Sequence, residues 1–512
     1  MVASCTVVET GGARVGTADE EVIEVTLHPD RERQTIHNFG ASDAWSIQFV
    51  GEHWPEVKRE RIADLLFSTD TTADGSPIGI GLSAWRFNLG AGSVEQGRES
   101  GIRDRWRRAE SFLRADGSFD AAAQPGQRAF LRAARARGVE QFYAFTNSPP
   151  VAITRNGRAH SSGGDAANLA PERYADYARV LVRALDEIRR TDGVTFTYVS
   201  PVNEPQWDWT GGQEGGPWRN EEIAAFAREL SGALVEAGLP TRIELAETAR
   251  LNYLYETADK PTRGAQARAF FDPASPHFVG DLPHVSPSLA AHSYFTTYPA
   301  DTLRSVRRRV REELRAVDPE LELVISEYCV LEDNPLIEGS GRDLGMNTAL
   351  YVTGVIHSDL VDAEASAWQW WLAVSPYDYK DGLIYIDRDT LDGAVYESKL
   401  LWALGHYSRF VRPGMRRIEV TARDTVLVNG TDAELLTSAY RDPVTGRMVA
   451  VLVNRGEEAR RVRLIGMRGG AVYRTTEDPD VNLRRDGSLS AEGELLVPGR
   501  SLVTVAGEGV TG

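Results

Sequence analysis

The feature that most constrains the fold of this chain is a regular alternation of two hydrophobic patterns. Short apolar runs without a helical period recur along most of the sequence, and such runs are typical of parallel strands buried on both faces. Stretches with apolar residues at helical spacing separate them. The eight strand-like runs are Thr35–Gly40, Gly81–Leu89, Glu140–Thr146, Thr195–Val202, Arg242–Ala246, Ser288–His292, Leu321–Ser326 and Ala365–Trp370.

The helical stretches come at the spacing that repeated strand–helix units require. They cover Pro55–Phe67, Gln127–Arg137, Pro171–Arg190, Glu221–Ala237, Thr302–Val317, Asp343–Ser358 and Ser398–Phe410. Successive strand ends are roughly 35 to 60 residues apart, which leaves room for one helix and its loops in each unit. Eight such units predict an α/β protein with a (β/α)8 TIM barrel, which we place at residues 37–411.

The last hundred residues have a different pattern. After Pro413, short β-rich runs alternate with turn signals such as Asn429-Gly430. Val22–Leu27 also has a strand-like pattern, but it precedes the barrel and has no helix to pair with. We therefore expect an associated β-sandwich side domain, built from residues 412–512 and from a strand within residues 1–36.

The net charge excludes two large classes of partner. The chain has 57 Lys and Arg residues against 74 Asp and Glu residues, a formal net charge of −17. Such a charge repels nucleic-acid backbones and anionic membrane surfaces, and no apolar run reaches the roughly 18 to 20 residues of a membrane span. We expect neither nucleic acid nor membrane as a partner. The oligomeric state stays open.

The N-terminal residues bear on location. Met1 to Glu20 lacks the basic and then apolar layout of a signal peptide. The sequence as it stands therefore predicts a cytoplasmic protein, or a secreted one if a signal peptide has been removed. Cys5 and Cys329 are the only cysteines, which excludes a disulfide framework and a thiolate metal site.

Two glutamates stand at the ends of distant strands of the predicted barrel. Glu204 follows the fourth strand, within Asn203-Glu204-Pro205, and Glu327 ends the seventh, within Ser326-Glu327. The loops after the strands build the active site in this fold. Hydrolysis of a glycosidic bond with retention needs one carboxylic acid to protonate the leaving oxygen and one carboxylate to attack the anomeric carbon. One such glutamate alone would indicate a cap or an ion pair, but the pair predicts a glycoside hydrolase.

Three further motifs lie at the ends of the first three strands. They are His37–Trp45, Arg86–Gly90 and Thr146–Pro150. Together with the two glutamate motifs they resemble glycoside hydrolase family 30, a family of retaining glycosidases, and the resemblance covers most of the chain. It implies a (β/α)8 barrel with a side β-sandwich built from the N-terminal strand and the C-terminal segment. One departure is Val151–Ile153, where many members have a tryptophan.

The resemblance implies a role for each matching residue. Glu204 would be the acid/base, Glu327 the nucleophile, and Asn203 a hydrogen-bond partner of the 2-hydroxyl on the attacked sugar. The second and third motifs are most similar to the β-1,6-galactanase branch, so the favoured partner is an oligo- or polysaccharide of β-1,6-linked galactose. Other branches act on β-1,6-glucan, glucuronoxylan or glucosylceramide and stay as alternatives, as does endo against exo action.

Three polar residues at strand ends are expected to act on the two glutamates. Arg86 ends a buried strand, where an unpaired guanidinium is costly, so we expect it to pair with Glu327. His292 and Tyr294 end the sixth strand and are expected to orient Glu204 or Glu327 by hydrogen bonds. No metal-ligand spacing such as His-x-x-x-His accompanies them, so the sequence predicts no metal and no other cofactor.

Aromatic and polar side chains near strand ends are candidates for the walls of a sugar site. Alternation along the eighth strand points Trp368 and Trp370 to one side and Trp371 to the other. We expect Trp370 to be the sugar platform and Trp371 to be a packing residue. The remaining candidates are Asp43, a possible partner of an axial 4-hydroxyl, and Trp45, Asn147 and Trp207.

Two other classes of function share parts of this pattern. A non-catalytic carbohydrate-binding barrel would have the aromatic residues without needing Glu204, Glu327 and Asn203 together, and release of reducing sugar would exclude it. A metal-dependent sugar isomerase would need several Asp, Glu or His side chains around one cation, and insensitivity to a chelator would exclude it.

Overall fold

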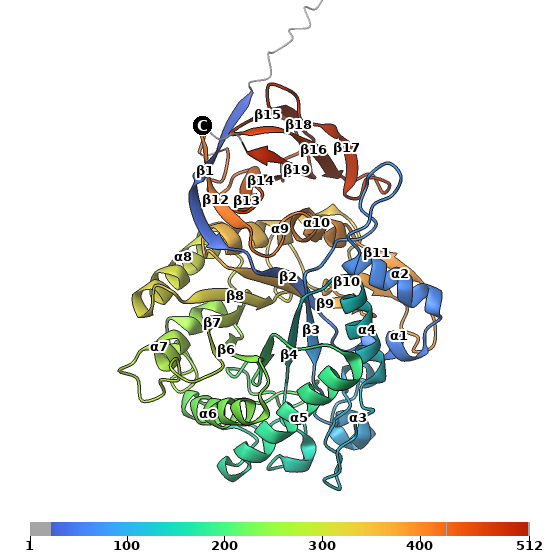
Figure 1. The fold of residues 1–512 in the computed structure, drawn as a ribbon, viewed down its shortest axis with the longest axis vertical. Helices are drawn as coiled ribbons and strands as arrows, with labels where there is room; N and C mark the ends of the chain where they lie inside the picture. Colours follow the sequence, from blue (N-terminus) through green and yellow to red (C-terminus); the bar gives the residue numbers. More distant parts are fainter. Residues whose placement is uncertain (1–21, 426, 510–512) are drawn as a thin grey trace, which may run out of the picture.

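The computed structural model describes residues 22–425 and 427–509, and eight parallel strands form a barrel within them (Figure 1). Each strand pairs with the next in sequence, and the last closes the ring by pairing with the first and the seventh. The strands are β2 (Asn38–Ser42), β3 (Ala84–Asn88), β4 (Gln141–Phe145), β5 (Tyr198–Ser200), β6 (Arg242–Thr248), β7 (Val285–His292), β8 (Glu322–Glu327) and β9 (Ala367–Ser375). Each of the eight predicted runs overlaps one of them, so the predicted TIM barrel is confirmed.

Helices surround the barrel. They are α1 (Ile47–His53), α2 (Glu56–Phe67), α3 (Ser93–Gln96), α4 (Pro125–Ala136), α5 (Tyr174–Asp192), α6 (Asn220–Ala237), α7 (Gln266–Phe271), α8 (Ala300–Val317), α9 (Met346–Val361) and α10 (Lys399–Ser408). All seven predicted helices are among them. The short helices α1, α3 and α7 were not predicted, because a helix of four to seven residues is too short to show a helical period. Two short strands, β10 (Gly382–Ile386) and β11 (Val395–Glu397), extend the barrel sheet beyond β9.

The remaining strands form a side domain. They are β1 (Ile23–Thr35), β12 (Arg416–Ala422), β13 (Leu435–Arg441), β14 (Arg447–Asn454), β15 (Arg460–Ile465), β16 (Met467–Thr475), β17 (Arg484–Ser488), β18 (Glu494–Val497) and β19 (Ser501–Gly509). Where the sequence predicted a sandwich, the strands are joined in one curled mixed sheet with its own apolar core. Its order is β17-β16-β19-β14-β13-β12-β1-β15-β18.

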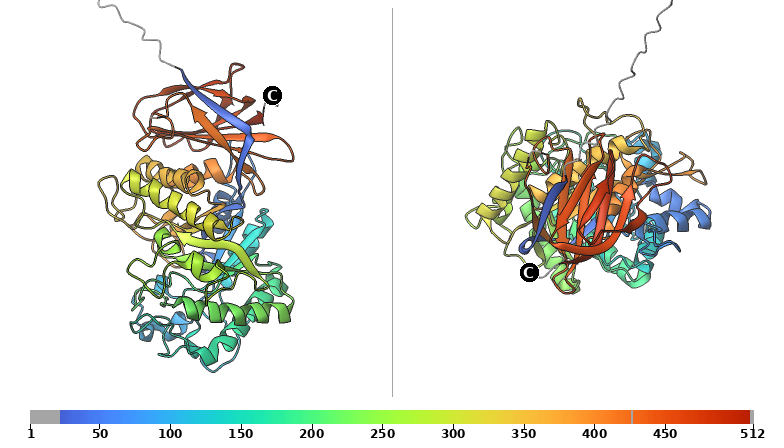
Figure 2. Two further views of the ribbon diagram at one scale, coloured as in Figure 1. Left: turned by 90° about the vertical axis from the view of Figure 1, so that its left-hand side faces the viewer. Right: turned by 90° about the horizontal axis from the view of Figure 1, so that it is seen from above.

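The first strand of the chain belongs to this side sheet. β1 pairs antiparallel with β12 and parallel with β15, and the chain then continues directly into β2 of the barrel. Figure 2 shows the side sheet lying against α9 and α10, which contact β13, β16 and β19. Buried His406 of α10 bonds the hydroxyls of Thr475 and Thr504 across this junction. The domain boundaries after residues 36 and 411 stay predictions.

Two glycines allow α1 and α4 to approach closely beside the first two strands. A Cβ atom on Gly51 would lie 2.1 Å from the carbonyl oxygen of Gly126, and one on Gly126 would lie 1.9 Å from that of Gln48. No side chain fits at such distances. The close contact between α1 and α4 therefore depends on these two glycines. It holds together the helices that follow β2 and β3.

Within the described residues, no helix is long and apolar enough to cross a membrane. Met1 to Glu20, on which the predicted location depends, and Cys5 lie outside these residues. Cys329 is buried and forms no disulfide in the part of the chain that the structure describes.

Candidate active site

Five polar side chains from five barrel strands meet at the carboxyl end of the barrel. Arg86 lies in β3, Glu204 follows β5, Glu247 lies in β6, His292 ends β7 and Glu327 ends β8. None of the five is more than 5% exposed. We refer to these five residues as the carboxylate network. Because they come from strands on opposite sides of the barrel, only the closed fold brings them together.

Glu327 is held by two hydrogen-bond donors that the sequence pointed to. Arg86 Nη1 donates to Oε2 at 2.7 Å, and the hydroxyl of Tyr294 donates to Oε1 at 2.8 Å. The Arg86 guanidinium also lies 3.7 Å from the ring centre of Phe145. A carboxylate that accepts from a cation and a hydroxyl is stabilised as an anion and is fixed in orientation.

Glu204 has a different environment. Its Oε1 lies 3.0 Å from Nδ1 of His292, and its backbone N–H donates to the carbonyl of Glu247. Burial raises the pKa of Glu204 above its usual range, and His292 opposes that rise only in part. Its backbone adopts a φ of +44°, which is rare for a residue with a side chain and is typical of strained positions at functional sites.

Glu247 is a network member that the sequence reasoning does not find. Its Oε1 lies 3.3 Å from Arg86 Nη2, and its Oε2 lies 3.0 Å from His292 Nε2. Burial alone would raise the pKa of Glu247, but Arg86 and His292 together hold it well below its usual range. The available signal is position, because Glu247 directly follows the predicted fifth strand as Glu204 follows the fourth.

His292 joins the carboxyl groups. Burial works to lower the pKa of its imidazole, but Glu327, Glu204 and Glu247 raise it to about 10. A positively charged imidazolium donates from both ring nitrogens. His292 can therefore donate to Glu204 and Glu247 at the same time, as its two 3.0 Å contacts require.

Asn203 lies beside the network, as its place in the sequence predicted. Arg86 Nη2 donates to its Oδ1 at 3.2 Å, and the residue is buried. This bond orients the amide while its Nδ2 group stays available for another acceptor, which suits a residue that binds a ligand next to Glu204.

Polar atoms without partners gather at the ends of β2, β3 and β4. Among the described residues, Asp43 Oδ2, Trp45 Nε1 and both side-chain polar atoms of Asn88 and Asn147 lack a hydrogen-bond partner. The other oxygen of Asp43 accepts from the backbone of Asn88 and from Gln127, and burial raises the pKa of Asp43 to about 8. Buried polar atoms are normally paired, so this edge of the barrel has unused hydrogen-bonding capacity.

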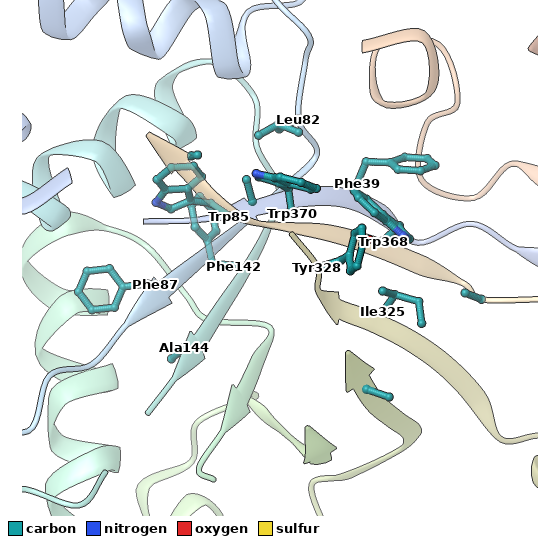
Figure 3. Close-up of a cluster of buried hydrophobic side chains, with 14 of the residues drawn as sticks. Phe39, Leu82, Trp85, Phe87, Phe142, Ala144, Ile325, Tyr328, Trp368 and Trp370 are labelled. Atoms are coloured by element: carbon teal, nitrogen blue, oxygen red, sulfur yellow. The ribbon is translucent and has the colours of Figure 1, made fainter. Parts of the chain in front are cut away.

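Trp370 does not line the site, which corrects the expectation that it is a sugar platform. Trp368 and Trp370 are fully buried and stack on each other, and Figure 3 shows their rings among buried apolar side chains. Trp368 Nε1 donates to Asp359 on α9, so these rings lie between the strands and the helices.

Trp371 takes the opposite position. Its ring is partly exposed and lies 5.4 Å from that of Trp45 and 6.2 Å from that of Phe145, which in turn lies under Arg86. The alternation along the strand was predicted correctly, but the assignment of its sides was wrong. Both faces of a barrel strand are buried, so alternation alone does not say which face points inward.

The loop after β5 is tied to its neighbours. The hydroxyl and backbone N–H groups of Ser93, and the N–H group of Ala91, donate to Glu214. Trp209 Nε1 donates to the carbonyl of Glu204, and Trp207, also on this loop, is partly exposed. Hydrogen bonds of Glu214 and Trp209 therefore hold this loop next to Glu204 and to the loop after β3.

One oxygen of Glu204, one oxygen of Glu327 and one ring nitrogen of His292 lie within 4.8 Å of one another. By distance alone these three atoms could hold a cation. The Arg86 guanidinium and the His292 imidazolium already place positive charge against these carboxylates, which opposes binding of a further cation. That the protein uses no metal stays a prediction.

Comparisons with known proteins find one family model that matches most of the chain, and several similar proteins. The model of "O-Glycosyl hydrolase family 30" matches residues 22–385. The "Endo-beta-1,6-galactanase" of Hypocrea rufa is 23% identical over 476 residues, which cover 88% of this chain and 86% of that protein. The "Glucuronoxylanase XynC" of Bacillus subtilis (strain 168) is 24% identical over 366 residues, 66% of this chain and 67% of that protein.

A solved structure is similar over nearly the whole chain. It is described as a conserved exported protein from Bacteroides fragilis, is 35% identical, and has a TM-score of 0.89. The match covers 95% of this chain and 100% of that one, so it includes both the barrel and the side sheet.

Proposed function

This chain belongs to glycoside hydrolase family 30, and from that premise we propose that it cleaves its glycan with retention of configuration, using Glu327 as nucleophile and Glu204 as acid/base. As a member of this family it acts on β-linked glycans.

The observation that carries the proposal is the closeness of the two carboxyl groups, which bring one oxygen each to within 4.8 Å. Retaining enzymes place their carboxyl groups about 5 to 5.5 Å apart, whereas inverting enzymes need roughly 6.5 to 9.5 Å to admit a water molecule between them. The short spacing favours direct attack by one carboxylate on the anomeric carbon.

The environments of the glutamates support the assignment of roles. Glu327 accepts from Arg86 and Tyr294, which favours the anionic form that a nucleophile needs. The raised pKa of Glu204 favours the protonated form that a general acid needs. Two carboxyl groups whose environments push them toward different protonation states are the usual basis for separate acid and nucleophile roles.

The reaction then has two steps. Glu327 attacks the anomeric carbon, the glycosidic bond breaks, and the proton of Glu204 passes to the leaving oxygen. Water next attacks the same carbon, its proton passes to Glu204, and the bond to Glu327 breaks. Two inversions at one carbon retain the β configuration.

The unused polar atoms at the ends of β2, β3 and β4 support binding of a sugar beside the network. Sugar hydroxyls both donate and accept, so they match the unpaired carboxyl oxygen of Asp43, the indole N–H of Trp45 and the amides of Asn88 and Asn147. Asn203, next to Glu204, is proposed to bond the 2-hydroxyl.

For the substrate we propose β-1,6-linked galactan. The support is the resemblance of the second and third strand-end motifs to the galactanase branch and the match, over most of both chains, to a protein named as an endo-β-1,6-galactanase. Asp43, fully buried beside Asn88, is the proposed partner of the axial 4-hydroxyl that distinguishes galactose from glucose. A site with such a partner strongly disfavours the isomer that leaves it unpaired.

A comparison of substrates with analysis of the product tests these proposals. β-1,6-Galactan, β-1,6-glucan and glucuronoxylan are incubated with the enzyme under one condition, and the first product is followed by NMR. We expect fastest release from galactan and an initial β anomer. Faster release from either other polymer would overturn the substrate, and an initial α anomer would overturn the mechanism.

Two variants test the roles of the glutamates. Glu327→Ala is expected to lose at least roughly 10⁴-fold in kcat, because no glycosyl-enzyme can form. Glu204→Ala is expected to slow cleavage of unactivated glycosides by about 10²- to 10⁴-fold and aryl glycosides far less, because good leaving groups need little protonation. Azide should rescue Glu204→Ala and give a β-glycosyl azide. A β-glycosyl azide from Glu327→Ala, or an α-glycosyl azide from Glu204→Ala, would require the roles to be exchanged.

A further inference from the structure

Three side chains outside the carboxylate network lie in the loops that follow three successive barrel strands, β5, β6 and β7. Trp207 follows Glu204 by three residues, Arg250 follows Glu247 by three, and Phe295 follows His292 by three. All three therefore lie at the carboxyl end of the barrel, close in sequence to members of the network. We refer to Trp207, Arg250 and Phe295 as the rim cluster.

The members of the rim cluster contact one another. The rings of Trp207 and Phe295 meet edge to face, with their centres 6.3 Å apart and their planes at 87°. The Arg250 guanidinium lies 5.1 Å from the ring centre of Trp207 and 4.9 Å from that of Phe295. Phe295 also lies 6.3 Å from the ring of Tyr294, which holds Glu327. The rim cluster is thus continuous with the network below it.

Phe295 is exposed to solvent and has a strained backbone. Its side chain is 43% exposed, although it is a large apolar ring. Its backbone has a φ of +56°, a conformation that bulky residues rarely adopt and that persists where the surroundings enforce it. A residue selected only for packing would be buried in an ordinary conformation, so the exposure and the strain together point to contact with a ligand.

Arg250 differs from two other arginines that lie over aromatic rings, Arg309 and Arg388. Arg309 lies 4.4 Å from the ring centre of Tyr255 and pairs with Glu256, and Arg388 lies over Tyr377 and pairs with Asp104. No carboxylate within the described residues pairs with Arg250, and its buried Nε lacks a hydrogen-bond partner there. Arg250 therefore has donors that nothing in the described protein uses.

We propose that the rim cluster binds the sugar on the leaving-group side of the scissile bond. The inference rests on the proposed function, because it needs Glu204 to be the acid that protonates the leaving oxygen. Aromatic faces bind the apolar face of a sugar ring, and guanidinium donors bind its hydroxyls. The rim cluster offers both at one place, and a neutral pyranose needs both.

The position of the cluster decides which sugar it binds. The backbone N–H of Trp207 donates to the carbonyl of Glu204, so the cluster begins directly beside the proposed acid. The partly exposed ring of Trp371 on β9 packs against buried Trp45 in the loop after β2, at the opposite edge of the barrel. The leaving oxygen lies on the side of its acid, so the rim cluster faces the leaving sugar.

A transfer reaction isolates this subsite from cleavage itself. The donor is the β-fluoride of β-1,6-linked galactobiose. Glu327 displaces its fluoride and forms the glycosyl-enzyme without any sugar in the leaving position. Methyl β-galactoside is then added as acceptor. Its 6-hydroxyl attacks the anomeric carbon, its proton passes to Glu204, and the bond to Glu327 breaks. The acceptor occupies the leaving-group subsite. The acceptor concentration that gives half-maximal transfer therefore measures how well the rim cluster binds it.

For Trp207→Ala, Phe295→Ala and Arg250→Ala, we expect the half-saturating acceptor concentration to rise roughly five- to ten-fold. Fluoride release without acceptor should stay within about two-fold of the wild type, because that step does not use the subsite. Arg309→Ala is the matched control, since it removes an arginine from an aromatic ring elsewhere, and it should behave as the wild type. Unchanged acceptor dependence in all three variants, or an equal change in Arg309→Ala, would overturn the inference.

Failure of the proposed function has a separate signature, which is the absence of fluoride release by the wild type. Binding of methyl β-galactoside, followed by saturation-transfer NMR, then decides the inference by itself. Loss of the signal in Trp207→Ala and its retention in Arg309→Ala would support the subsite. Equal signals in the wild type and Trp207→Ala would refute it.

Discussion

Glu204 and Glu247 are both buried glutamates with a φ of +44°, yet their pKa values move in opposite directions. Burial favours the neutral form of each. Only Glu247 has both the Arg86 guanidinium and the His292 ring within 3.3 Å, and these hold it ionised. A permanent anion behind His292 keeps a proton on the imidazole, so Glu247 controls the charge that Glu204 experiences from His292.

The substitution Glu247→Gln should change the pH dependence of activity. Removing the anion removes one cause of the raised pKa of His292, so the site as a whole binds protons less tightly. We expect the alkaline limb of the kcat/KM profile to move to lower pH by roughly one pH unit. The profile is measured with an unactivated substrate, since its cleavage requires the acid.

Glu244→Gln is the matched control for this prediction. Glu244 lies on the same strand and is equally buried, but its oxygen accepts from Ser288 and contacts no member of the network. Burial raises its pKa to about 8, so it is largely neutral at pH 7 and the substitution changes little charge. An alkaline limb that moves equally in both variants would show that the effect of Glu247→Gln is not specific to His292.

At the scale of elements, β9 places side chains on both of its faces, one toward the surrounding helices and one toward the inside of the barrel. Its residues alternate between the helix side, where Trp368 and Trp370 pack, and the inner side, where Gln369 bonds Asn38 and Trp371 reaches the ring of Trp45. The two kinds of tryptophan therefore have separable tasks. Trp370 contributes to the core, and Trp371 is available to a ligand.

Alanine substitutions on β9 are expected to divide accordingly. Trp370→Ala should lower the free energy of unfolding by about 3 to 5 kcal/mol, because it empties a large volume in a closed core. Trp371→Ala should cost less than about 2 kcal/mol and should raise KM up to roughly ten-fold. Chemical denaturation and steady-state kinetics on both variants measure this. Normal KM in Trp371→Ala together with a large loss of stability would show that Trp371 is a packing residue.

The elements also show what the sequence could and could not predict. The barrel strands are parallel and covered on both faces, so they appear as continuous apolar runs, and Glu204 and Glu327 stand out at their ends. The sides of β9 could not be assigned, because both faces are apolar. Glu247 was missed because a single glutamate after a strand is common on protein surfaces, and only the closed barrel brings Arg86 and His292 against it.

At the scale of the whole molecule, several buried groups bind protons more tightly in the folded than in the unfolded state. Burial raises the pKa of Asp43 to about 8, of Glu214 to about 7 and of Glu244 to about 8. An acid with a raised pKa stabilises the fold less as the pH rises from its unfolded value through its folded value. His292, raised to about 10, contributes stability below its ordinary value and loses it as the pH rises toward 10.

These four groups have the same sign, whereas burial lowers the pKa of His357 and of His406 to about 3, so these two oppose the trend below the ordinary histidine value. The melting temperature should therefore fall between about pH 7 and pH 9. Glu247 does not oppose this trend, because its lowered pKa gives a contribution that is constant across that range. Glu244→Gln should make the decline less steep, since it removes one of the groups. Thermal unfolding at one scan rate across this range measures the effect, and a melting temperature that rises from pH 7 to pH 9 would contradict it.

The place of β1 in the side sheet has a consequence for how the molecule is made. Val25 pairs with Ala422, which is 397 positions later, and the other neighbour of β1 is later still. At a synthesis rate of about 5 to 20 residues per second, β1 is made on the order of 20 to 80 s before β12. The barrel can close during that interval, but the side sheet cannot. The side sheet can therefore form only after the C-terminal strands are made, and β12 and β15 then pair with the two edges of β1.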